Sequence, residues 1–287
     1  KKILITGANS YIGTSFEKWV NRWPNDYIVD TIDIQSEKWI EKSFEGYDVV
    51  IHLAAVVHVK ENDVSKYFKV NKELALKVAN KAKSEHVKQF IFLSTMGVYG
   101  TETGYITVDT EPNPKTPYAK SKYEAEILLN QLNDDKFKIA ILRPPIVYGK
   151  GCRGNYPRLA RMALKLPYFP EIDNKRSMIY IDNLSEFIRV IIDECVEGVF
   201  FPQNRDYVNT TYLVTNIAKV HGKKIKTTNI LNCGVNLGVN LSGTFRKVFG
   251  TFIYDKAMPG GPDTLLNGKK LNYDTVSFEK SIIETEN

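Results

Sequence analysis

Short apolar strands alternate with helical patterns through the first half of the chain, and this order constrains the fold more than any other feature. The strands are nearly continuous apolar runs rich in β-branched residues, which is typical of strands buried on both faces. The expected strands are residues 1–6, 27–33, 47–55, 89–95 and 138–144, and the expected helices are 11–23, 63–85 and 117–132. A parallel α/β sheet covered on both faces is therefore predicted. Ligands bind such sheets beyond the carboxyl ends of the strands.

The pattern loosens after Gly149, and we expect a smaller lobe there. Helices are expected at 154–166, 183–194 and 210–222, and short strands at 176–182 and 198–202. From Ile225 onward, Gly, Asn and Thr mix with short apolar groups, and no element is assigned. Residues 1–149 are thus predicted to form a nucleotide-binding core. Residues 150–287 form a discontinuous substrate lobe, of which about 176–202 return to the core.

Composition narrows the classes of protein that the chain can belong to. The 287 residues carry a formal charge of +6, and the basic stretch 219–226 lacks interleaved aromatic residues, which argues against a nucleic-acid partner. No apolar run reaches the roughly 18–20 residues of a membrane helix, and no signal peptide is recognised at the start. Cys152, Cys195 and Cys233 are few, odd in number and far apart, so we expect a reducing, cytoplasmic compartment and no metal site.

The first strand leads into a loop that has the features of a phosphate site. The segment "TGANSYIG" joins the strand to a helix. Backbone N–H groups and the positive end of the helix dipole would then both face a phosphate bound at the start of the helix. Gly7 is expected to make the turn and Gly13 to let the helix pack closely on the strand. Ser10 stands where such loops usually carry glycine, and a left-handed backbone there would cost on the order of 1 kcal/mol. We therefore expect a slightly reshaped loop that grips a cofactor only moderately tightly.

An acidic residue follows the second strand at the distance that a dinucleotide site requires. Asp33 lies 20 residues beyond Gly13, where a carboxylate can bind ribose hydroxyls. Because a carboxylate repels a 2′-phosphate, NAD(H) is favoured, although NADP(H) stays possible. Asp30 competes for this role, and Lys38 could soften the selectivity.

A tyrosine and a lysine one helical turn apart predict acid–base chemistry. Tyr118 and Lys122 share a helix face, and a neighbouring ammonium favours the phenolate of a tyrosine whose ordinary pKa is near 10. The pair could move a proton on or off a sugar oxygen. The fourth strand ends in Ser94 and Thr95, at the same sheet edge as Gly7, where a hydroxyl can bond the reacting oxygen.

At this point the chain resembles the extended short-chain dehydrogenases/reductases of the nucleotide-sugar epimerase/dehydratase kind. The matching segments follow the expected order over residues 3–184: "TGANSYIG", "DVVIHLAA", "LSTMGVYG", "PYAKSK", "LRPPIVYG" and "RSMIYIDNL". The resemblance implies a Rossmann-type doubly wound sheet, an NAD(H) cofactor and a UDP-sugar substrate. It also allows a homodimer.

The resemblance carries residue roles onto matching positions. Thr95, Tyr118 and Lys122 match the catalytic Ser/Thr, Tyr and Lys, and Asn71 matches a helix residue that supports the active site. The stretch from His52 matches one lining the cofactor, and Arg143 and Pro144 match the segment beside the nicotinamide. Expected cofactor contacts are Gly7, Asn9, Ser10, Tyr11, Ile12, Gly13, Asp33, Leu53, Ala54, Ala55, Tyr118, Lys122 and Pro144. Expected substrate contacts are Thr95, Met96, Asn155 and Arg176, the last two at the diphosphate.

Two reactions and one non-catalytic role remain open on this resemblance. The segments 143–184 and 241–250 look like reductases of bacterial capsule and O-antigen synthesis, which reduce C4 of a UDP-4-keto-6-deoxy-N-acetylhexosamine. This is the predicted function. UDP-glucose or UDP-N-acetylglucosamine 4-epimerisation is the alternative, and a non-catalytic nucleotide-binding regulator is a second one, which the intact catalytic set disfavours. The segment 236–254 is interpreted as a lid over the sugar site in preference to a membrane-surface segment, because Gly and Asn interrupt its apolar pattern.

Overall fold

The computed structural model describes residues 1–57 and 63–287, which form two compact units. The first unit comprises Lys1–Gly100, Glu111–Pro144 and Ser185–Phe201, and the second comprises Thr101–Thr110, Pro145–Leu184 and Pro202–Asn287. Compared with the boundaries expected from the sequence, residues 101–110, 145–149 and 176–184 group with the second unit. The cause is strand pairing: β5 (Gly104–Ile106) pairs with β12 (Phe252–Tyr254), and β7 (Ile146–Tyr148) pairs with β9 (Met178–Tyr180).

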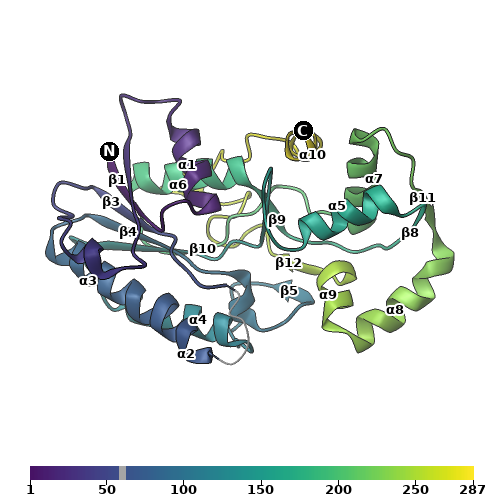
Figure 1. The fold of residues 1–287 in the computed structure, drawn as a ribbon, viewed down its shortest axis with the longest axis horizontal. Coiled ribbons are helices and arrows are strands. Elements are labelled where there is room, and N and C mark those ends of the chain that lie inside the picture. The colour runs from purple at the N-terminus through teal and green to yellow at the C-terminus, as the bar shows by residue number, and fades with distance from the viewer. Residues whose placement is uncertain (58–62) are drawn as a thin grey trace. The chain divides into compact units, whose positions relative to one another are not determined.

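A six-stranded sheet forms the centre of the first unit, and all of its pairings are parallel (Figure 1). The order is β10-β6-β4-β3-β1-β2. The strands are β1 (Lys2–Thr6), β2 (Ile28–Ile32), β3 (Val49–His52), β4 (Gln89–Leu93), β6 (Lys138–Leu142) and β10 (Gly198–Phe200). Strand β2 pairs on one side of β1, and β3 pairs on the other side, where the later strands are added. The resulting switch point between β1 and β3 is where such sheets bind ligands.

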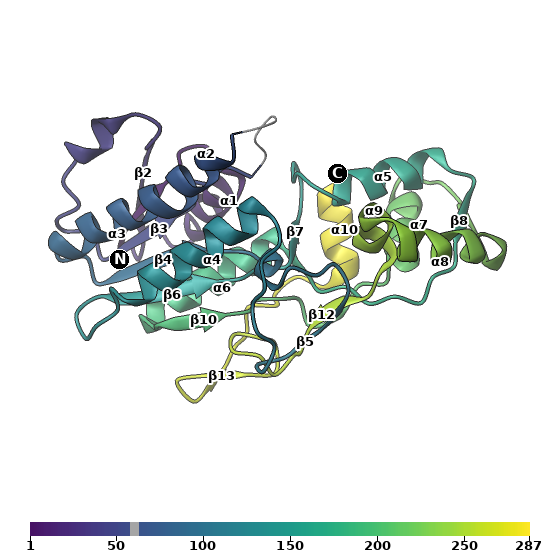
Figure 2. The ribbon, with the colours of Figure 1, turned by 90° about the horizontal axis from the view of Figure 1, so that it is seen from below.

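Helices cover both faces of this sheet, as Figures 1 and 2 show. On one face lie α2 (Val64–Phe68), α3 (Ala75–Ser84) and α4 (Pro117–Asn130), and on the other lie α1 (Tyr11–Val20) and the part of α6 (Ile181–Glu194) from Ser185 onward. Alternate strand residues point to opposite faces. Leu4, Val50 and Phe90 consequently pack in one buried cluster with Ala79 of α3 and Leu129 of α4. The predicted doubly wound α/β fold is confirmed.

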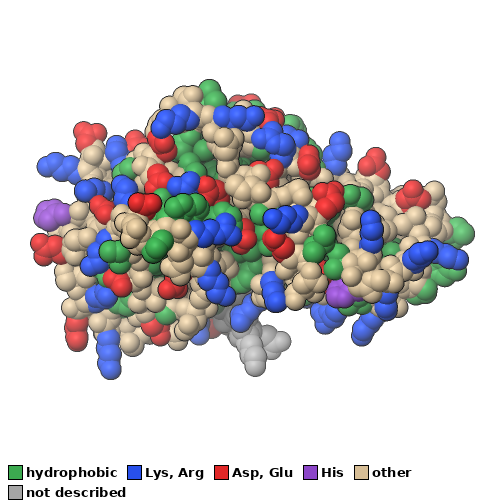
Figure 3. Space-filling view, turned by 90° about the horizontal axis from the view of Figure 1, so that it is seen from above, with side chains coloured by type: hydrophobic (Ala, Val, Ile, Leu, Met, Phe, Trp, Pro, Cys, Tyr) green, Lys and Arg blue, Asp and Glu red, His purple; other side chains and the backbone are tan. Residues whose placement is uncertain are grey.

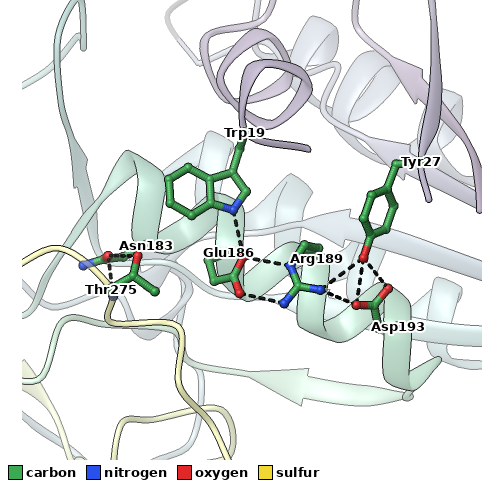
Figure 4. A network of polar contacts seen from close by, with 7 residues as sticks. All are labelled: Trp19, Tyr27, Asn183, Glu186, Arg189, Asp193 and Thr275. Carbon is green, nitrogen blue, oxygen red and sulfur yellow. Dashed lines mark hydrogen bonds and ion pairs between the residues drawn. The ribbon is translucent and has the colours of Figure 1, made fainter. Parts of the chain in front are cut away.

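A polar network ties α1 to α6 in the first unit (Figure 4). Trp19 donates its indole N–H to Glu186 at 2.8 Å. Arg189 forks onto both carboxylate oxygens of Glu186, at 2.8 and 2.7 Å, and also bonds Tyr27 and Asp193. A bidentate arginine–carboxylate pair has a defined geometry. The network therefore fixes how α1, the helix after the phosphate loop, lies on the sheet.

The second unit is built from short two-stranded sheets and five helices that lie wholly within it. The strand pairs besides β5–β12 and β7–β9 are β8 (Tyr168–Pro170) with β11 (Lys226–Thr228), and β13 (Leu265–Leu266) with β14 (Lys269–Lys270). The helices are α5 (Tyr156–Lys165), α7 (Thr210–Val220), α8 (Asn232–Leu241), α9 (Gly243–Phe249) and α10 (Phe278–Glu286). Asn183, whose carbonyl oxygen accepts the backbone N–H groups of Thr275 and Val276, holds the segment that leads to α10.

Two parts of the secondary structure differ from expectation. The helix expected over 63–85 contains a wide π-helical turn at Lys69–Leu74, and three α-helices follow residue 225, where the sequence assigns no element. Gly and Asn are weak helix formers, so α8 carries little local helical signal. Within residues 1–57 and 63–287, no helix combines the length and apolarity needed to cross a bilayer.

Candidate active site

At its two glycines, the segment that joins β1 to α1 passes too close to neighbouring atoms to accept a side chain. Gly7 has φ +103°, and a Cβ there would lie 2.8 Å from the backbone nitrogen of Ala54. At Gly13 a Cβ would lie 2.6 Å from Ser10 Oγ and 3.2 Å from a methyl carbon of Ile5. Both glycines thus do what the sequence predicts: one makes the turn and the other brings helix and strand together.

Ser10 does not strain this loop, contrary to one possibility left open by the sequence. Its φ is −67°, in the extended region, and its hydroxyl accepts the Gly13 N–H at 3.2 Å as the N-cap of α1. The left-handed residue is its neighbour Asn9, with φ +62°. Asparagine tolerates this conformation better than most residues. The departure from glycine therefore gives the helix a cap in an unstrained turn.

The two aspartates near the end of β2 have different surroundings. Asp30 accepts a hydrogen bond from the hydroxyl of Tyr47, a buried residue of the core. Asp33 is exposed beyond the strand, and its side chain accepts only the nearby Gln35 N–H, at 2.9 Å, among the contacts that the structure gives. Asp30 is thus held within the fold, whereas Asp33 is available to a ribose. Lys38 is exposed in the 3₁₀ turn Glu37–Ile40.

His52 packs against the aromatic side chains of the neighbouring strand. It is fully buried, Nδ1 lies 2.8 Å from the Thr6 hydroxyl, and the ring stacks against Phe90 and Phe92. Burial lowers its pKa to about 3, with the nearby Lys122 adding to the effect, so the ring is neutral at physiological pH. Leu53, Ala54 and Ala55 follow at the carboxyl end of β3, beside Gly7.

Thr95 and Tyr118 meet beyond the carboxyl end of β4. Thr95 lies close enough to affect the pKa of Tyr118, and its Oγ1 accepts the Gly97 N–H at 3.1 Å. Pro117 sits in the first turn of α4, which is capped by Thr116, so Tyr118 lies at the start of that helix. Burial raises the pKa of Tyr118 to about 12, although the Thr95 side chain opposes this shift. The tyrosine is consequently a neutral phenol that can give up a proton.

Lys122 lies against the end of β4, and burial has the largest effect on its charge. The residue is 2% exposed, and its ammonium donates to the Leu93 carbonyl at 2.8 Å and lies 4.4 Å from the centre of the Phe92 ring. Burial lowers its pKa to about 7, against the raising effect of Glu126. Burial thus has the largest effect on the pKa of both Tyr118 and Lys122. The expected lowering of the tyrosine pKa by this lysine is not among the shifts that the structure gives.

A buried ion pair between Glu126 of α4 and Arg143 explains why the side chains of Ser94 and Thr95 have different surroundings. The Arg143 guanidinium forks onto Glu126, with Nε 3.2 and 3.1 Å from the two oxygens and Nη2 2.6 Å from one of them. Ser94 bonds the same carboxylate, and Arg143 also donates to the Tyr99 hydroxyl at 3.0 Å. Ser94 and Arg143 therefore turn into the fold. Sequence reasoning missed Glu126, although its position one turn after Lys122 on the same helix face was a usable signal.

Asn71 joins three parts of this site from within the π-helical turn. Its side chain accepts the Val56 N–H at 2.8 Å and donates to the Val56 carbonyl at 3.0 Å. It also donates to Ser121 Oγ at 3.1 Å, and Ser121 in turn bonds the Tyr118 carbonyl at 2.8 Å. π-helical turns occur often at functional sites. Here the turn aims one amide at both the loop after β3 and the first turn of α4.

Met96 and Pro144 lie together in the first unit, since the Pro144 carbonyl accepts the Met96 N–H at 3.1 Å. The other expected substrate residues belong to the second unit. Asn155 precedes α5, and both Asn155 and Arg176 line a small cavity to which Lys247 also contributes. Arg176 is 7% exposed and donates to the Gly250 carbonyl at 2.9 Å, whereas its buried Nε has no partner among the described residues. Burial lowers the pKa of Arg176 to about 10.

Comparison with known proteins decides the family. The sequence pattern of the NAD dependent epimerase/dehydratase family matches residues 3–208. The chain belongs to this family. It is 32% identical over 247 residues to a UDP-glucose 4-epimerase of Vibrio cholerae, covering 76% of this chain and 75% of that protein. The resemblance inferred from the sequence is thus confirmed, as is NAD as the cofactor.

Other members of the family and of the fold extend the comparison. An N-acetyl-α-D-glucosaminyl-diphospho-ditrans,octacis-undecaprenol 4-epimerase of Escherichia coli O157:H7 is 24% identical, covering 79% of this chain and 75% of that one. A variant of UDP-glucuronic acid 4-epimerase from Bacillus cereus, solved with a fluorinated UDP-sugar and NAD, aligns over 100% of this chain and 98% of that one with a TM-score of 0.71 and 21% identity. At this identity the structural likeness shows the fold alone.

The site of this family member fits a dinucleotide. Gly7 leaves no room for a Cβ beside Ala54, α1 begins at the same loop with a capped N-terminus, and Asp33 is exposed at the neighbouring strand end. Backbone N–H groups at a helix N-terminus favour phosphate, and a carboxylate at the next strand favours ribose hydroxyls. The chain is therefore an NAD-dependent enzyme whose residues suit its cofactor.

Proposed function

We propose that the enzyme exchanges hydride and a proton at C4 of a UDP-linked hexose, and that its reaction is reduction of a UDP-4-keto-6-deoxy-N-acetylhexosamine. The observation that carries the proposal is that the Thr95 side chain lies beside Tyr118, with Lys122 buried one helical turn further along α4. The reaction needs a hydroxyl group that can meet a sugar oxygen, and this pair supplies one.

Tyr118 acts as the general acid in this scheme. Its pKa of about 12 keeps it protonated at neutral pH, so it can donate a proton to the oxygen of a C4 ketone as hydride arrives at the carbon. Thr95 bonds the same oxygen and stabilises the negative charge that develops there. Lys122 serves as a positioning group and as the cationic neighbour for the phenolate that forms.

We assign the cofactor to the loop and strand ends of the first unit. Residues 7–13 would hold the diphosphate, Asp33 the adenosine ribose, and Leu53–Ala55 and Pro144 the neighbouring surface. When bound, NAD supplies the hydride donor or acceptor. The carboxylate of Asp33 favours NADH over NADPH, because it repels a 2′-phosphate.

The second unit supports binding of an anionic substrate. The Nε–H of Arg176 is buried beside Asn155 without a partner in the described part of the chain, and a buried polar group costs free energy until it is paired. A phosphate oxygen would satisfy it. Substrate binding by Arg176 and Asn155 is therefore part of the proposal, together with Met96 beside Thr95.

UDP-hexose 4-epimerisation is the second candidate, and the relative from Vibrio cholerae favours it. An epimerase would use the same tyrosine first as a base and then as an acid, with hydride removed and returned to the other face of the sugar. The undecaprenol-linked relative makes a lipid-linked N-acetylhexosamine a further substrate to offer.

Net consumption of cofactor distinguishes the two reactions. The protein is given UDP-glucose, UDP-N-acetylglucosamine and a UDP-4-keto-6-deoxy-N-acetylhexosamine, each with NADH or NADPH, and the products are identified. A reductase oxidises one NADH for each sugar reduced, whereas an epimerase converts UDP-glucose to its C4 epimer with no net oxidation. Binding without turnover of any substrate would favour a regulator.

Substitution of the acid tests the site itself. Tyr118→Phe removes the transferable proton and should lower turnover by about two to four orders of magnitude. Tyr123→Phe on the same helix is the matched control and should stay within a few-fold of the wild type. A Tyr118→Phe enzyme that also stays there would rule out the assignment.

A further inference from the structure

The net charge of the chain is concentrated in one stretch of the second unit. The protein has 39 Lys and Arg and 33 Asp and Glu, and residues 207–254 contain six of the former and none of the latter. The rest of the chain is therefore balanced, with 33 residues of each sign. Three of the six lysines and arginines, Lys223, Lys224 and Lys226, lead into β11, which pairs with β8.

Acidic groups from other segments neutralise only part of this charge. Glu102 forms ion pairs with both Arg246 and Lys247 of α9, at 3.5 and 3.2 Å. Glu171 follows β8, near the start of α8. Lys224 and Lys226 have no ion pair within residues 1–57 and 63–287, and Lys226 lies exposed opposite Tyr168, which is itself 52% exposed.

An apolar helix face follows these lysines in the chain. Ile230, Leu237 and Leu241 are 88%, 61% and 76% exposed. Their spacing of seven and four residues puts them on one side of α8 and of the turn Asn229–Leu231 that precedes it. We call these three side chains the α8 face. Single exposed leucines are common, but an aligned row is a feature of an interaction surface.

The helix that carries this face has little support of its own. Three of its ten residues are Asn and two are Gly, which are weak helix formers, and only Val235 is buried. Helix α8 contacts α9, where the Phe245 ring covers Gly238, and it contacts the turn Asn229–Leu231 that precedes it. Ten-residue helices are marginal in water without packing. Burying the α8 face would therefore stabilise the segment.

A UDP-sugar does not account for this face. Such a substrate is polar and anionic and has no apolar surface to cover three aliphatic side chains, so a lid role over the sugar leaves them in water. Aliphatic residues beside unpaired lysines and an exposed tyrosine match a lipid interface instead, where the apolar groups enter the acyl boundary and the cations face anionic headgroups. Figure 3, which views the molecule from the side away from α8, shows Lys and Arg side chains among hydrophobic ones at the end of this unit.

We propose that the α8 face, with Lys224 and Lys226, binds the surface of an anionic lipid bilayer. The inference stands on the second unit alone and does not depend on the reaction proposed above. Binding would be peripheral and reversible, because the apolar contribution is three side chains and the electrostatic one is screened by salt.

Vesicle co-sedimentation of the full-length protein tests this surface. We expect binding to vesicles of equal parts phosphatidylglycerol and phosphatidylcholine, at least tenfold weaker binding to phosphatidylcholine alone, and release by high salt. Leu237→Asn/Leu241→Asn and Lys224→Gln/Lys226→Gln should each weaken binding about tenfold or more. Leu265→Asn, at a 65% exposed leucine in β13, is the matched control and should bind like the wild type. Catalytic activity on a soluble substrate should be unchanged in all three.

A label on α8 gives a second readout that leaves the α8 face and its lysines unsubstituted. Cys233 is exposed on α8, whereas Cys152 is buried. In a Cys195→Ser protein, an environment-sensitive fluorophore at Cys233 should shift its emission to the blue when anionic vesicles are added. Three outcomes would overturn the proposal: no preference for anionic vesicles, binding that the leucine substitutions leave unchanged, or an unshifted label. A stable dimer that Leu237→Asn/Leu241→Asn dissociates, or tighter binding to single-stranded DNA than to the vesicles, would do the same.

Discussion

At the scale of single residues, the structure separates two adjacent hydroxyls that look alike in the sequence. Ser94 bonds the buried carboxylate of Glu126, whereas Thr95 reaches Tyr118. A strand alternates its side chains between faces, so neighbouring positions at its end cannot share a role. Which of the two faces the reacting oxygen depends on the register of β4, and that register follows from pairing with β3 and β6.

Paired substitutions test this difference. Thr95→Val keeps the side-chain shape and removes the hydroxyl, so the activation barrier should rise by about 2–4 kcal/mol, the usual worth of one such hydrogen bond. Ser94→Ala should lower the free energy of unfolding by about 1–2 kcal/mol and leave turnover nearly unchanged. Steady-state kinetics and urea denaturation of both variants measure the two effects. The reverse pattern would put the catalytic hydroxyl at Ser94.

We expect Asp33 to set the preference between NADH and NADPH, and Ser10 to affect how tightly the cofactor is held. Asp33→Asn should reduce the preference for NADH over NADPH, because it weakens the ribose contact and removes repulsion of a 2′-phosphate. Ser10→Gly exchanges one good helix cap for another at a cost of a few tenths of a kcal/mol, so cofactor binding should be unchanged or tighter. Titration of the wild type and both variants with each reduced cofactor measures these preferences.

A wild-type enzyme that prefers NADPH would contradict the role of Asp33. Much weaker binding by Ser10→Gly would show that the serine hydroxyl itself is a phosphate ligand, because the cap alone is worth too little. We also expect the wild type to exchange its cofactor during purification.

At the scale of elements, the π-helical turn at Lys69–Leu74 is the part that positions the active site. Asn71→Ala removes the amide that links Val56 to Ser121 in α4. Because misplacement by about 1 Å can lower a rate a hundredfold, kcat should fall roughly ten- to hundredfold while KM changes little. Asn80→Ala in α3 is the matched control, since that side chain bonds only its own helix at the Leu76 carbonyl. Equal kinetics for the two variants would leave Asn71 a structural residue.

The elements that sequence reasoning found are those whose signal is local. The six strands of the main sheet are short apolar runs, and α1 and α4 carry caps or a first-turn proline. The π-helical turn escaped because its period differs little from that of an α-helix over six residues. Helix α8 escaped because its Gly and Asn content opposes the helix, and its apolar row shows only once the helix is known.

The residues of the candidate site also divide into those with a local sequence signal and those without one. Gly7, Gly13, Thr95, Tyr118 and Lys122 were found because spacing and strand ends reveal them. Glu126 and the conformation of Ser10 were not, since one depends on packing behind α4 and the other on a backbone angle. Motifs therefore identify groups that meet ligands, and the structure adds those that hold them.

At the scale of the whole molecule, the buried neutral His52 links stability to pH. Its pKa is about 3 in the fold and about 6.5 when exposed, so between these values the unfolded chain binds a proton that the folded chain does not. The free energy of unfolding must then fall as the pH falls through this window, by about 1.4 kcal/mol per pH unit well below 6.5. Above pH 6.5 the full stability is present.

Urea denaturation at several pH values tests this linkage, with substitutions that do not titrate. His52→Gln keeps a polar partner for Thr6 but no longer protonates, so the wild type should lose stability relative to it as the pH falls from 7 towards 4. His86→Gln, at an exposed position, should instead follow the wild type throughout. If the His52→Gln and wild-type curves stay parallel down to pH 4, another buried group governs acid unfolding. In that case Phe90 and Phe92 tolerate a charged imidazole between β3 and β4, and the sheet is less rigid at its centre than its packing indicates.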